Sequence, residues 1–395
     1  MEAPFTISVG TPNITGRGIS YVQEALRNKR LSYGPFMQRF ETSFARHHGC
    51  NFGIMSNSGT SALHIALAAL KEIHGWNDGD EVIVPAVTFI ATSNIVLHNN
   101  MKVTFVDVEP DHYEIDPHKI EEAITPRTRA IIPVHLFGQP CDMDPIRSIA
   151  KKHNLKLIED SCETMFASYK GTPAGSLGDI GCFSTYIAHL ITTGVGGLNT
   201  TNNPEYAIKI RSIMNHGRDS IYLNIDDDNQ KSPEEMKTII ARRFSFVSLG
   251  HSFRATEMEA ALGLAQVEEW EQLILPRRKH AAILTEGLRD VEHLIQLPSI
   301  RAHTEHSFMM YPIVLKKEKK ERVVNALESN GIETRDMLPL TNQPVYKKYL
   351  GINEDEFPVA KWINESGFYI GCHQDLTPEQ LQYMIHAIKE AVIQK

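Results

Sequence analysis

Residues 178–197 read GDIGCFSTYIAHLITTGVGG, and more of this molecule can be inferred from that stretch than from any other. It contains a single histidine, His189, just before a glycine-rich turn. It contains no lysine, and none occurs between Lys170 and Lys209. An imidazole can move protons at neutral pH, because its unperturbed pKa is near 6.5, but it has no primary amine with which to hold a carbonyl compound covalently. The stretch therefore presents a candidate acid/base.

Upstream of this stretch, short runs rich in Val and Ile alternate with helical patterns. The apolar runs are residues 52–56, 81–84, 103–106, 130–134 and 156–158. Runs of this length and composition are typical of buried parallel strands. Residues 60–73 and 144–153 have helical patterns, and Pro145 suits a first helical turn. The alternation predicts an α/β fold with helices on both faces of a sheet, and ligands at the carboxyl ends of its strands.

The C-terminal part of the chain has a different pattern. A strong helix is predicted over residues 257–266, begun by Thr256, and the sequence Pro276-Arg277-Arg278-Lys279 then predicts a break. Beyond the break, helices near residues 279–290, 320–329 and 378–393 and a strand at 309–315 indicate a smaller α+β domain. We therefore predict a large domain over residues 1–275 and a small one over residues 276–395.

Bulk properties exclude several classes of protein. The 395 residues are 42% apolar and 22% charged, with a net charge of −8, which argues against binding to nucleic acid or to an anionic membrane. The sequence lacks a signal-peptide pattern and a run of roughly 18 apolar residues. The five cysteines are scattered without a C-x-x-C pair, which predicts free thiols in the cytoplasm and no metal site.

Two further segments carry candidate chemistry. Residues 56–61 follow a predicted strand and open a helix, where free backbone N–H groups suit a phosphate and Gly59 allows close approach. The alternative is a plain helix cap formed by Ser58 or Thr60. Glu159 and Asp160 end a buried strand, and a carboxylate there could face a protonated pyridine nitrogen or be merely structural.

The stretch at 178–197 resembles the cofactor-lysine segment of the DegT/StrS-type nucleotide-sugar aminotransferases, which depend on pyridoxal 5′-phosphate (PLP) and have fold type I. His189 stands in the lysine's place. Other matching segments are Leu31-Ser32-Tyr33-Gly34-Pro35, Ser58-Gly59-Thr60-Ser61-Ala62-Leu63, Pro85-Ala86-Val87-Thr88-Phe89-Ile90-Ala91-Thr92, residues 133–144, and Gly367-Phe368-Tyr369-Ile370. The resemblance implies a large, mostly parallel seven-stranded domain, PLP or its amine form pyridoxamine 5′-phosphate (PMP), and a homodimer with shared active sites.

The resemblance also assigns cofactor-binding residues. The cofactor phosphate would be held by Gly59, Thr60, Ser61 and Ser184. Asp160 matches the aspartate that faces the pyridine nitrogen, and Glu159 is then structural. Phe89 matches the aromatic residue that stacks on the ring, although a core phenylalanine is the alternative.

Other positions depart from the family pattern or concern the substrate. Glu163 stands where the aminotransferases usually carry glutamine, and a carboxyl group there changes the protonation of its surroundings. Ser252 replaces an asparagine that reaches the partner's cofactor phosphate. His216 and Arg254 lie in later family motifs near substrate. Arg335 could pair with a sugar diphosphate or a glutamate carboxylate, or be a surface arginine.

Histidine at position 189 resembles a subset of the family that includes GDP-4-keto-6-deoxymannose 3-dehydratase and a CDP-sugar 3-dehydrase. In that subset histidine moves a proton at the cofactor's C4′ and the sugar's C3 hydroxyl is expelled. The CDP-sugar enzyme also holds an iron–sulfur cluster, which needs several thiolates close together. The scattered cysteines favour the cluster-free type. The expected reaction is the 3-dehydration of a nucleotide-linked 4-keto-6-deoxyhexose, with glutamate regenerating PMP.

Two alternatives to this reaction stay open, and a third is disfavoured. The chain could be a glutamate-dependent sugar aminotransferase in which another base replaces the lysine. It could also be a catalytically inactive family member that binds the cofactor. A Rossmann dehydrogenase built around residues 194–197 is disfavoured, because the glycines lack G-x-G-x-x-G spacing.

Overall fold

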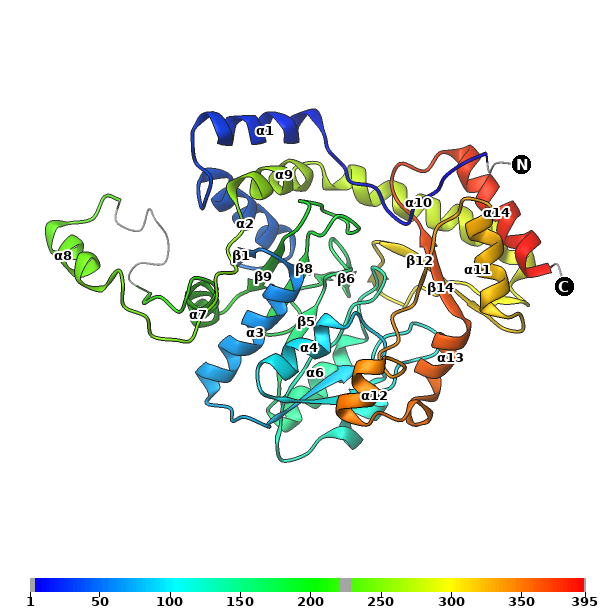
Figure 1. Ribbon diagram of the computed structural model, residues 1–395, viewed down its shortest axis with the longest axis horizontal. Coiled ribbons are helices and arrows are strands. Elements are labelled where there is room, and N and C mark those ends of the chain that lie inside the picture. The colour runs from blue at the N-terminus through cyan, green and yellow to red at the C-terminus, as the bar shows by residue number, and fades with distance from the viewer. Residues whose placement is uncertain (1–3, 221–228, 394–395) are drawn as a thin grey trace.

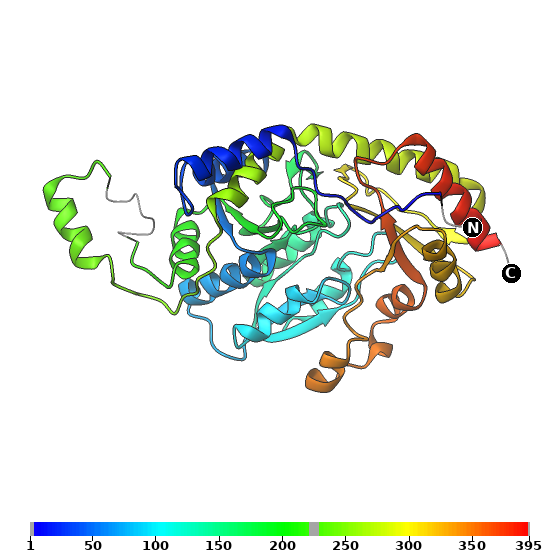
Figure 2. The ribbon, with the colours of Figure 1, turned by 45° about the horizontal axis from the view of Figure 1, so that its top comes forward.

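A computed structural model of the chain describes residues 4–220 and 229–393. A large sheet with helices on both sides forms the body, and a smaller sheet with its own helices lies beside it (Figure 1). α1 (Gly16–Arg27) lies beside α9 (Glu257–Val267) across the top of the body (Figure 2). α8 (Pro233–Arg242) projects well away from the rest.

The large sheet has seven strands in the order β1-β9-β8-β5-β4-β2-β3. Their bounds are β1 Phe52–Ser56, β9 Gly197–Thr201, β8 Ile180–Ser184, β5 Lys156–Asp160, β4 Thr128–Ile131, β2 Glu81–Pro85 and β3 Lys102–Val106. Pairing is parallel from β3 to β8, whereas β9 is antiparallel to both β8 and β1. Six strands thus run in one direction and β9 alone is reversed, which confirms the predicted α/β class.

The common direction of six strands brings distant segments to one edge of the sheet. The chain leaves β1 at Ser56, β5 at Asp160 and β8 at Ser184, all at carboxyl ends. The predicted strand 130–134 ends early, at Ile131, and Val134 makes only an isolated bridge to Asp160. A ligand site is expected at this edge, because loops from several strands converge there.

Helices cover the sheet. Those of the large domain are α1, α2 Pro35–His47, α3 Gly59–His74, α4 Ala91–His98, α5 Pro117–Ile120, α6 Met143–His153, α7 Pro204–Met214, α8 and α9. In α3 the Ser58 hydroxyl caps the helix by accepting the N–H of Ser61 (3.0 Å), and Gly75 ends it with a positive φ of 62°. Leu63, Leu67 and Leu70 are buried against the sheet, as the helical pattern predicts.

The smaller part holds a four-stranded antiparallel sheet in the order β10-β12-β14-β13. Its elements are β10 Ile295–Gln296, β12 Met310–Leu315, β13 Thr334–Asp336, β14 Gly367–Gly371, α11 Lys320–Ser329, α12 Pro344–Leu350, α13 Pro358–Ser366 and α14 Pro378–Ile393. A third, small sheet joins β11 Thr304–Glu305 to β6 Ser168–Tyr169 and β7 Thr172–Pro173. Ile7, near the N-terminus, is buried in the core of this smaller part.

The predicted break at Pro276-Arg277-Arg278-Lys279 is wrong. α10 (Trp270–Leu288) runs straight through it. Proline inside a helix removes one hydrogen bond, at a cost of about 3 kcal/mol. Here that cost is offset by burial of one face of the helix, including Ile274 and Ala281. Arg277, 2% exposed, donates to the carbonyl oxygen of Met309 (3.0 Å) and so joins α10 to the smaller sheet.

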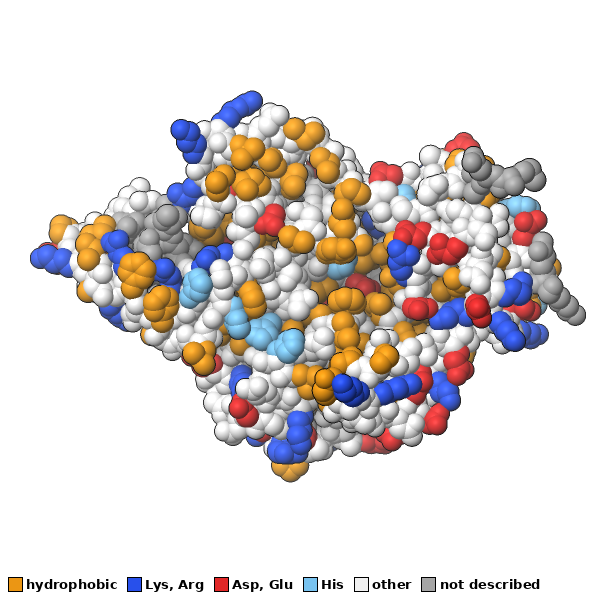
Figure 3. Space-filling view, in the orientation of Figure 1, with side chains coloured by type: hydrophobic (Ala, Val, Ile, Leu, Met, Phe, Trp, Pro, Cys, Tyr) orange, Lys and Arg blue, Asp and Glu red, His pale blue; other side chains and the backbone are white. Residues whose placement is uncertain are grey.

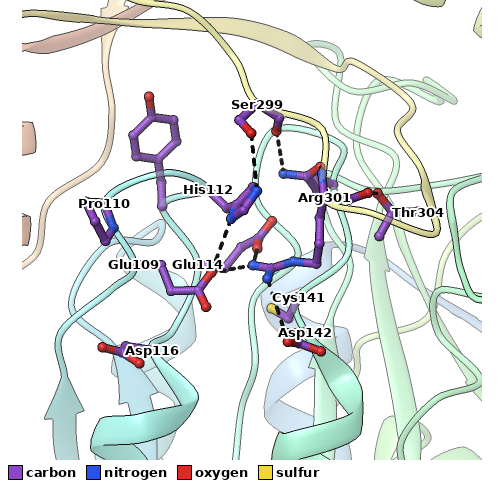
Figure 4. A network of polar contacts seen from close by, with 12 residues as sticks. Glu109, Pro110, His112, Glu114, Asp116, Cys141, Asp142, Ser299, Arg301 and Thr304 are labelled. Carbon is purple, nitrogen blue, oxygen red and sulfur yellow. Dashed lines mark hydrogen bonds and ion pairs between the residues drawn. The ribbon is translucent and has the colours of Figure 1, made fainter.

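A buried ionic network also joins the two parts (Figure 4). Arg301 pairs with Glu109 and Glu114, and the Glu114 contact is 2.7 Å. Its backbone N–H donates to the side chain of Gln139. Burial raises the pKa of Glu114 well above its ordinary value, and Arg301 opposes that rise.

None of the helices in the described ranges is both long and apolar enough to cross a membrane.

Candidate active site

A cavity of about 550 Å³ opens at the carboxyl edge of the large sheet. It is lined by loops that follow β1, β2, β5 and β8 and by the smaller sheet. Eight of the residues predicted for the site lie together on its wall: Gly59, Thr60, Phe89, Asp160, Glu163, Ser184, His189 and Arg335. Side chains more than 270 residues apart in the sequence are thus brought to one pocket.

One end of the cavity is formed by the first turn of α3. Within the described structure, the N–H groups of Gly59 and Thr60 have no acceptor, whereas that of Ser61 is used by the Ser58 cap. A Cβ at Gly59 would lie 2.6 Å from that of Ser184 and 3.0 Å from the Cys162 sulfur. Glycine is therefore needed for this turn to approach the end of β8. Free N–H groups at a helix N-terminus fit a phosphate.

Asp160 forms another part of the wall and is only 4% exposed. It accepts hydrogen bonds from Thr92 Oγ1 (2.7 Å) and from the Cys162 N–H (3.2 Å). Burial raises the pKa of Asp160 above its usual range, and these bonds oppose the rise. Among the described residues no lysine or arginine pairs with it, so a cationic N–H group brought by a ligand would relieve a costly buried charge.

Glu159, the neighbour of Asp160, has a different role. Its carboxylate accepts from the N–H groups of Gly175 (2.7 Å) and Gly178 (2.6 Å) and contacts His135 Nε2 at 2.9 Å. It is fully buried on the other side of the strand from Asp160, because successive side chains of a strand alternate. Glu159 therefore holds the loop that leads into β8.

Phe89 and Glu163 face the same cavity. Phe89 is 56% exposed, which is not the burial of a core phenylalanine and leaves its ring face available to a planar ligand. Glu163 Oε2 accepts the Phe137 N–H at 3.0 Å. Burial raises the pKa of Glu163 to about 7, with a further rise from the nearby Asp160 charge.

His189 lies in the loop after β8 and lines the cavity. Its Nδ1 is 3.0 Å from the carbonyl oxygen of Ser184. A carbonyl oxygen can only accept, so Nδ1 carries the ring proton and Nε2 keeps a lone pair. Burial lowers the pKa of His189 to about 4, which keeps the ring neutral at pH 7. A neutral imidazole with a fixed tautomer can act as a base.

No lysine is among the described residues that line the cavity. The two lysines that flank the stretch are engaged elsewhere: Lys170 contacts Asp144 and Lys209 contacts Glu72. Nothing on the described wall could therefore replace the missing amine of position 189.

Four predicted site residues do not line the cavity of the single chain: Ser61, Ser252, His216 and Arg254. Ser61 is buried and donates its hydroxyl to Asn57 (2.7 Å). Ser252 and Arg254 form a small cluster in which an Arg254 nitrogen contacts the Ser252 hydroxyl at 2.8 Å. His216 is exposed and has a positive φ of 64°.

Several cavity residues were missed from the sequence, among them Val9, Thr92 and Tyr369. Thr92 and Tyr369 lie inside segments that match the family, so their position could have been proposed from the resemblance. Val9 gives no local signal, because the packing of the N-terminus on the smaller sheet brings it there.

The wall fits one kind of ligand. A phosphate group suits the first turn of α3, a protonated ring nitrogen suits Asp160, and a flat ring suits Phe89. Together with a seven-stranded α/β sheet, these features define the class of PLP-dependent enzymes of fold type I.

Comparison with known proteins narrows the class. Residues 12–389 match the model of the DegT/DnrJ/EryC1/StrS aminotransferase family. The chain is 34% identical to GDP-perosamine synthase of Caulobacter vibrioides, over 98% of both chains. It is 32% identical to dTDP-4-dehydro-2,6-dideoxy-D-glucose 3-dehydratase of Saccharopolyspora spinosa, over 93% of this chain and 83% of that one.

Solved structures agree with the family match. That of GDP-4-keto-6-deoxy-D-mannose-3-dehydratase from E. coli with bound hydrated PLP superposes with a TM-score of 0.88 at 26% identity, covering 98% of this chain and all of that one. The chain belongs to the DegT/DnrJ/EryC1/StrS aminotransferase family. The resemblance inferred from the sequence is confirmed.

Proposed function

We propose that this enzyme is a PLP/PMP-dependent 3-dehydratase that acts on a nucleotide-linked 4-keto-6-deoxyhexose. The observation that carries the proposal is His189: a neutral imidazole of fixed tautomer lines the cavity where the family's lysine is expected. Relatives named as 3-dehydratases occur beside relatives named as perosamine synthases, so the choice rests on the chemistry of this residue.

The chain's own groups divide the work. Gly59, Thr60 and Ser184 would hold the cofactor phosphate, and Phe89 would offer its face to the cofactor ring. Asp160 holds the proton of the ring nitrogen, because a buried carboxylate gains most from a cationic partner. When bound in its amine form, the cofactor supplies an amine for the keto group and a ring that takes up electrons, which lets a neighbouring hydroxyl leave.

His189 moves the proton. Its Nε2 lone pair would take up the proton that the reaction releases, while Nδ1 stays bonded to the Ser184 carbonyl. The resulting imidazolium is then an acid that can protonate the departing C3 hydroxyl. A lysine in this place would bind covalently and favour amine transfer. L-Glutamate is the proposed donor that restores the amine form.

We also propose that the active unit is a homodimer. The segment around α8 (residues 233–249) projects from the body. Five of its apolar side chains are exposed: Ile240, Phe244, Phe246, Val247 and Leu249. Exposed apolar clusters of this kind mark interfaces. Ser252, His216 and Arg254 follow or precede this segment and would serve the partner's cavity. The cytoplasmic location stays a prediction.

The test combines a spectrum with a product analysis. Glutamate should convert the visible band of the aldehyde form into that of the amine form, and the amine-loaded protein should then release a 3-deoxy sugar from a 4-keto sugar. His189→Gln should retain the cofactor and lose roughly 10²- to 10⁴-fold in kcat, because a general base is removed. An amino sugar as the main product would instead support the second candidate, a glutamate-dependent sugar aminotransferase, which the perosamine synthase relatives favour.

A further inference from the structure

We propose that Glu333 is a positioning residue that controls Arg335, so that one cavity accepts both a neutral sugar ring and an anionic amino donor. The inference rests on the proposed function in one respect, that a nucleotide-linked sugar and an amino donor use the cavity in turn, the first placing a neutral hexose ring there and the second a carboxylate. It assigns a task to Glu333, which lies outside the cavity wall, and to the N-terminal strap (residues 7–11).

Arg335 is the only lysine or arginine among the described residues on the wall, which also carries two acids, Asp160 and Glu163. Any anionic group that enters has this one cation to meet. Arg335 lies on β13 directly opposite Tyr369 of β14, another residue of the wall. Its position is therefore fixed by the pairing of two strands.

In the structure Arg335 is paired with Glu333. The two side chains are two residues apart in extended backbone and so lie on one face. Arg335 is 51% exposed and Glu333 29% exposed. An ion pair with this much exposure is weak, because water screens it. An incoming carboxylate can therefore displace Glu333 and form the two-pronged contact that guanidinium groups prefer.

The strap also holds Glu333 in place, through hydrogen bonds that do not involve Arg335. The second carboxylate oxygen of Glu333 accepts the N–H of Val9 at 2.7 Å. The N–H of Glu333 donates to the carbonyl of Ile7 (2.9 Å), and the N–H of Ile7 donates to Gly331 (2.7 Å). Val9 itself lines the cavity. Glu333 cannot follow Arg335 inward without giving up the Val9 bond.

The strap also reaches the loop that carries His189. A Cβ at Gly10 would lie 3.5 Å from the carbonyl oxygen of Ala188, and one at Gly371 would lie 2.2 Å from that of Ser8. The strap thus packs closely against β14, and it is the dark blue segment that leads from the N-terminus to α1 in Figure 1. The strap therefore contacts both Glu333, the partner of Arg335, and the loop that carries His189.

These contacts predict which ligand groups must compete with Glu333 for Arg335. The hexose ring of the sugar substrate is neutral, so it can bind while Arg335 stays paired with Glu333; we assign the charged diphosphate of that substrate to a place away from Arg335. The carboxylate of an amino donor must compete with Glu333 for Arg335. Glu333 therefore weakens donor binding and prevents Arg335 from retaining anions while the sugar reacts.

The variant that tests this is Glu333→Gln, which keeps an oxygen to accept the Val9 N–H and removes the competing charge. The KM for glutamate should fall roughly two- to fivefold, the range expected for one exposed ion pair, while the KM for the keto sugar stays unchanged. The Kd of glutarate, a dicarboxylate without an amine, should fall by a similar factor in calorimetry. Adding Arg335→Met to the variant should abolish both gains.

Asp336→Asn is the matched control. It removes an equal charge three residues further along, in β13, but Asp336 pairs with Lys320 (2.8 Å) and not with Arg335. Both constants should stay at their original values. An unchanged or higher glutamate KM and glutarate Kd in Glu333→Gln, or equal shifts for both substrates, would overturn the inference. If the natural protein gave no spectral response to glutamate, the proposed function would fail, and the glutarate measurement would still decide the role of Glu333.

Discussion

His189 and Glu163 face one cavity, and burial moves their pKa values in opposite directions. The pKa of His189 is lowered to about 4 and that of Glu163 is raised to about 7. In both cases the low-polarity surroundings disfavour the charged form. The cavity thus keeps His189 neutral and holds a carboxyl group, that of Glu163, which changes protonation near neutral pH.

For Glu163 the consequence is a titration near pH 7. The activity of the natural protein should change across pH 6–8 in a way that Glu163→Gln removes, and a profile of kcat/KM against pH measures this. A Glu163→Gln profile with the same inflection near 7 would assign that titration to another group.

Stability should follow the same group. The folded pKa of Glu163 lies above the ordinary value of 4.5, so its contribution is fully present below pH 4.5 and is lost as pH rises through 7. The shift corresponds to about 3 kcal/mol at most. Urea unfolding at pH 5 and pH 8 should therefore show a smaller difference in Glu163→Gln than in the natural protein, since other groups titrate equally in both.

For His189 the expected acid limb of kcat/KM lies near pH 4 rather than 6.5. A ring whose folded pKa is depressed favours the folded protein above pH 6.5, and that contribution is lost as pH falls toward 4. Activity should therefore persist at pH 5.5, where a histidine with an ordinary pKa would be mostly protonated. An activity that halves near pH 6.5 would contradict the burial argument.

At the scale of elements, the turn between β1 and α3 gives the sharpest prediction. Gly59→Ala would place a methyl group 2.6 Å from the Ser184 Cβ, which would separate the two elements that we propose bind the cofactor phosphate. The Kd of the cofactor should rise roughly 10- to 100-fold, because one or two charge-assisted hydrogen bonds are lost. Equilibrium dialysis with PMP measures this.

Gly16→Ala is the matched control for that variant. A Cβ at Gly16 meets nothing within 4 Å, so the same substitution at the start of α1 should leave the Kd unchanged. An equal cofactor Kd in both variants and the natural protein would remove the phosphate role from the first turn of α3.

The elements themselves were predictable to the extent that their signals are local. The five predicted strands and α3 follow from apolar runs and spacing, and Asp160 follows from its place at a strand end. The antiparallel partner of β1 could not be predicted, because β9 lies about 140 residues away and strand direction depends on that pairing. The passage of α10 through Pro276 was missed because burial by distant residues outweighs a local preference. Val9 entered the cavity wall for the same kind of reason.

At the scale of the whole molecule, the network of Arg301 joins segments from the two parts (Figure 4). Arg301→Met leaves Glu114 buried at 1% exposure without its cation. Such a break costs about 3–5 kcal/mol, measurable as a lower urea midpoint. Adding Glu109→Gln and Glu114→Gln should restore most of the loss. Lys152→Met, which breaks an exposed pair with Glu121, should leave the midpoint unchanged, and equal effects of the two single variants would contradict the burial argument.

The proposed homodimer would use the projecting segment around α8. Leu249 is 98% exposed and Phe246 51% exposed, and the apolar side chains of this segment stand out at the far left of Figure 3. A single chain gains nothing from leaving them in water, whereas a second copy would bury them. Leu249→Glu with Phe246→Glu should therefore raise the dimer dissociation constant at least about 100-fold, as expected for buried apolar anchors.

Sedimentation velocity across a range of protein concentrations measures that constant, and Ile300→Glu supplies the control. Ile300 is 56% exposed, much like Phe246, but lies about 50 residues further along the chain, directly before Arg301. Its substitution should leave the dimer intact. If the partner supplies residues such as Arg254 to the cavity, the monomeric variant should also lose activity at dilutions where the Ile300→Glu protein keeps it. A fully active monomer would show that one chain completes its own site.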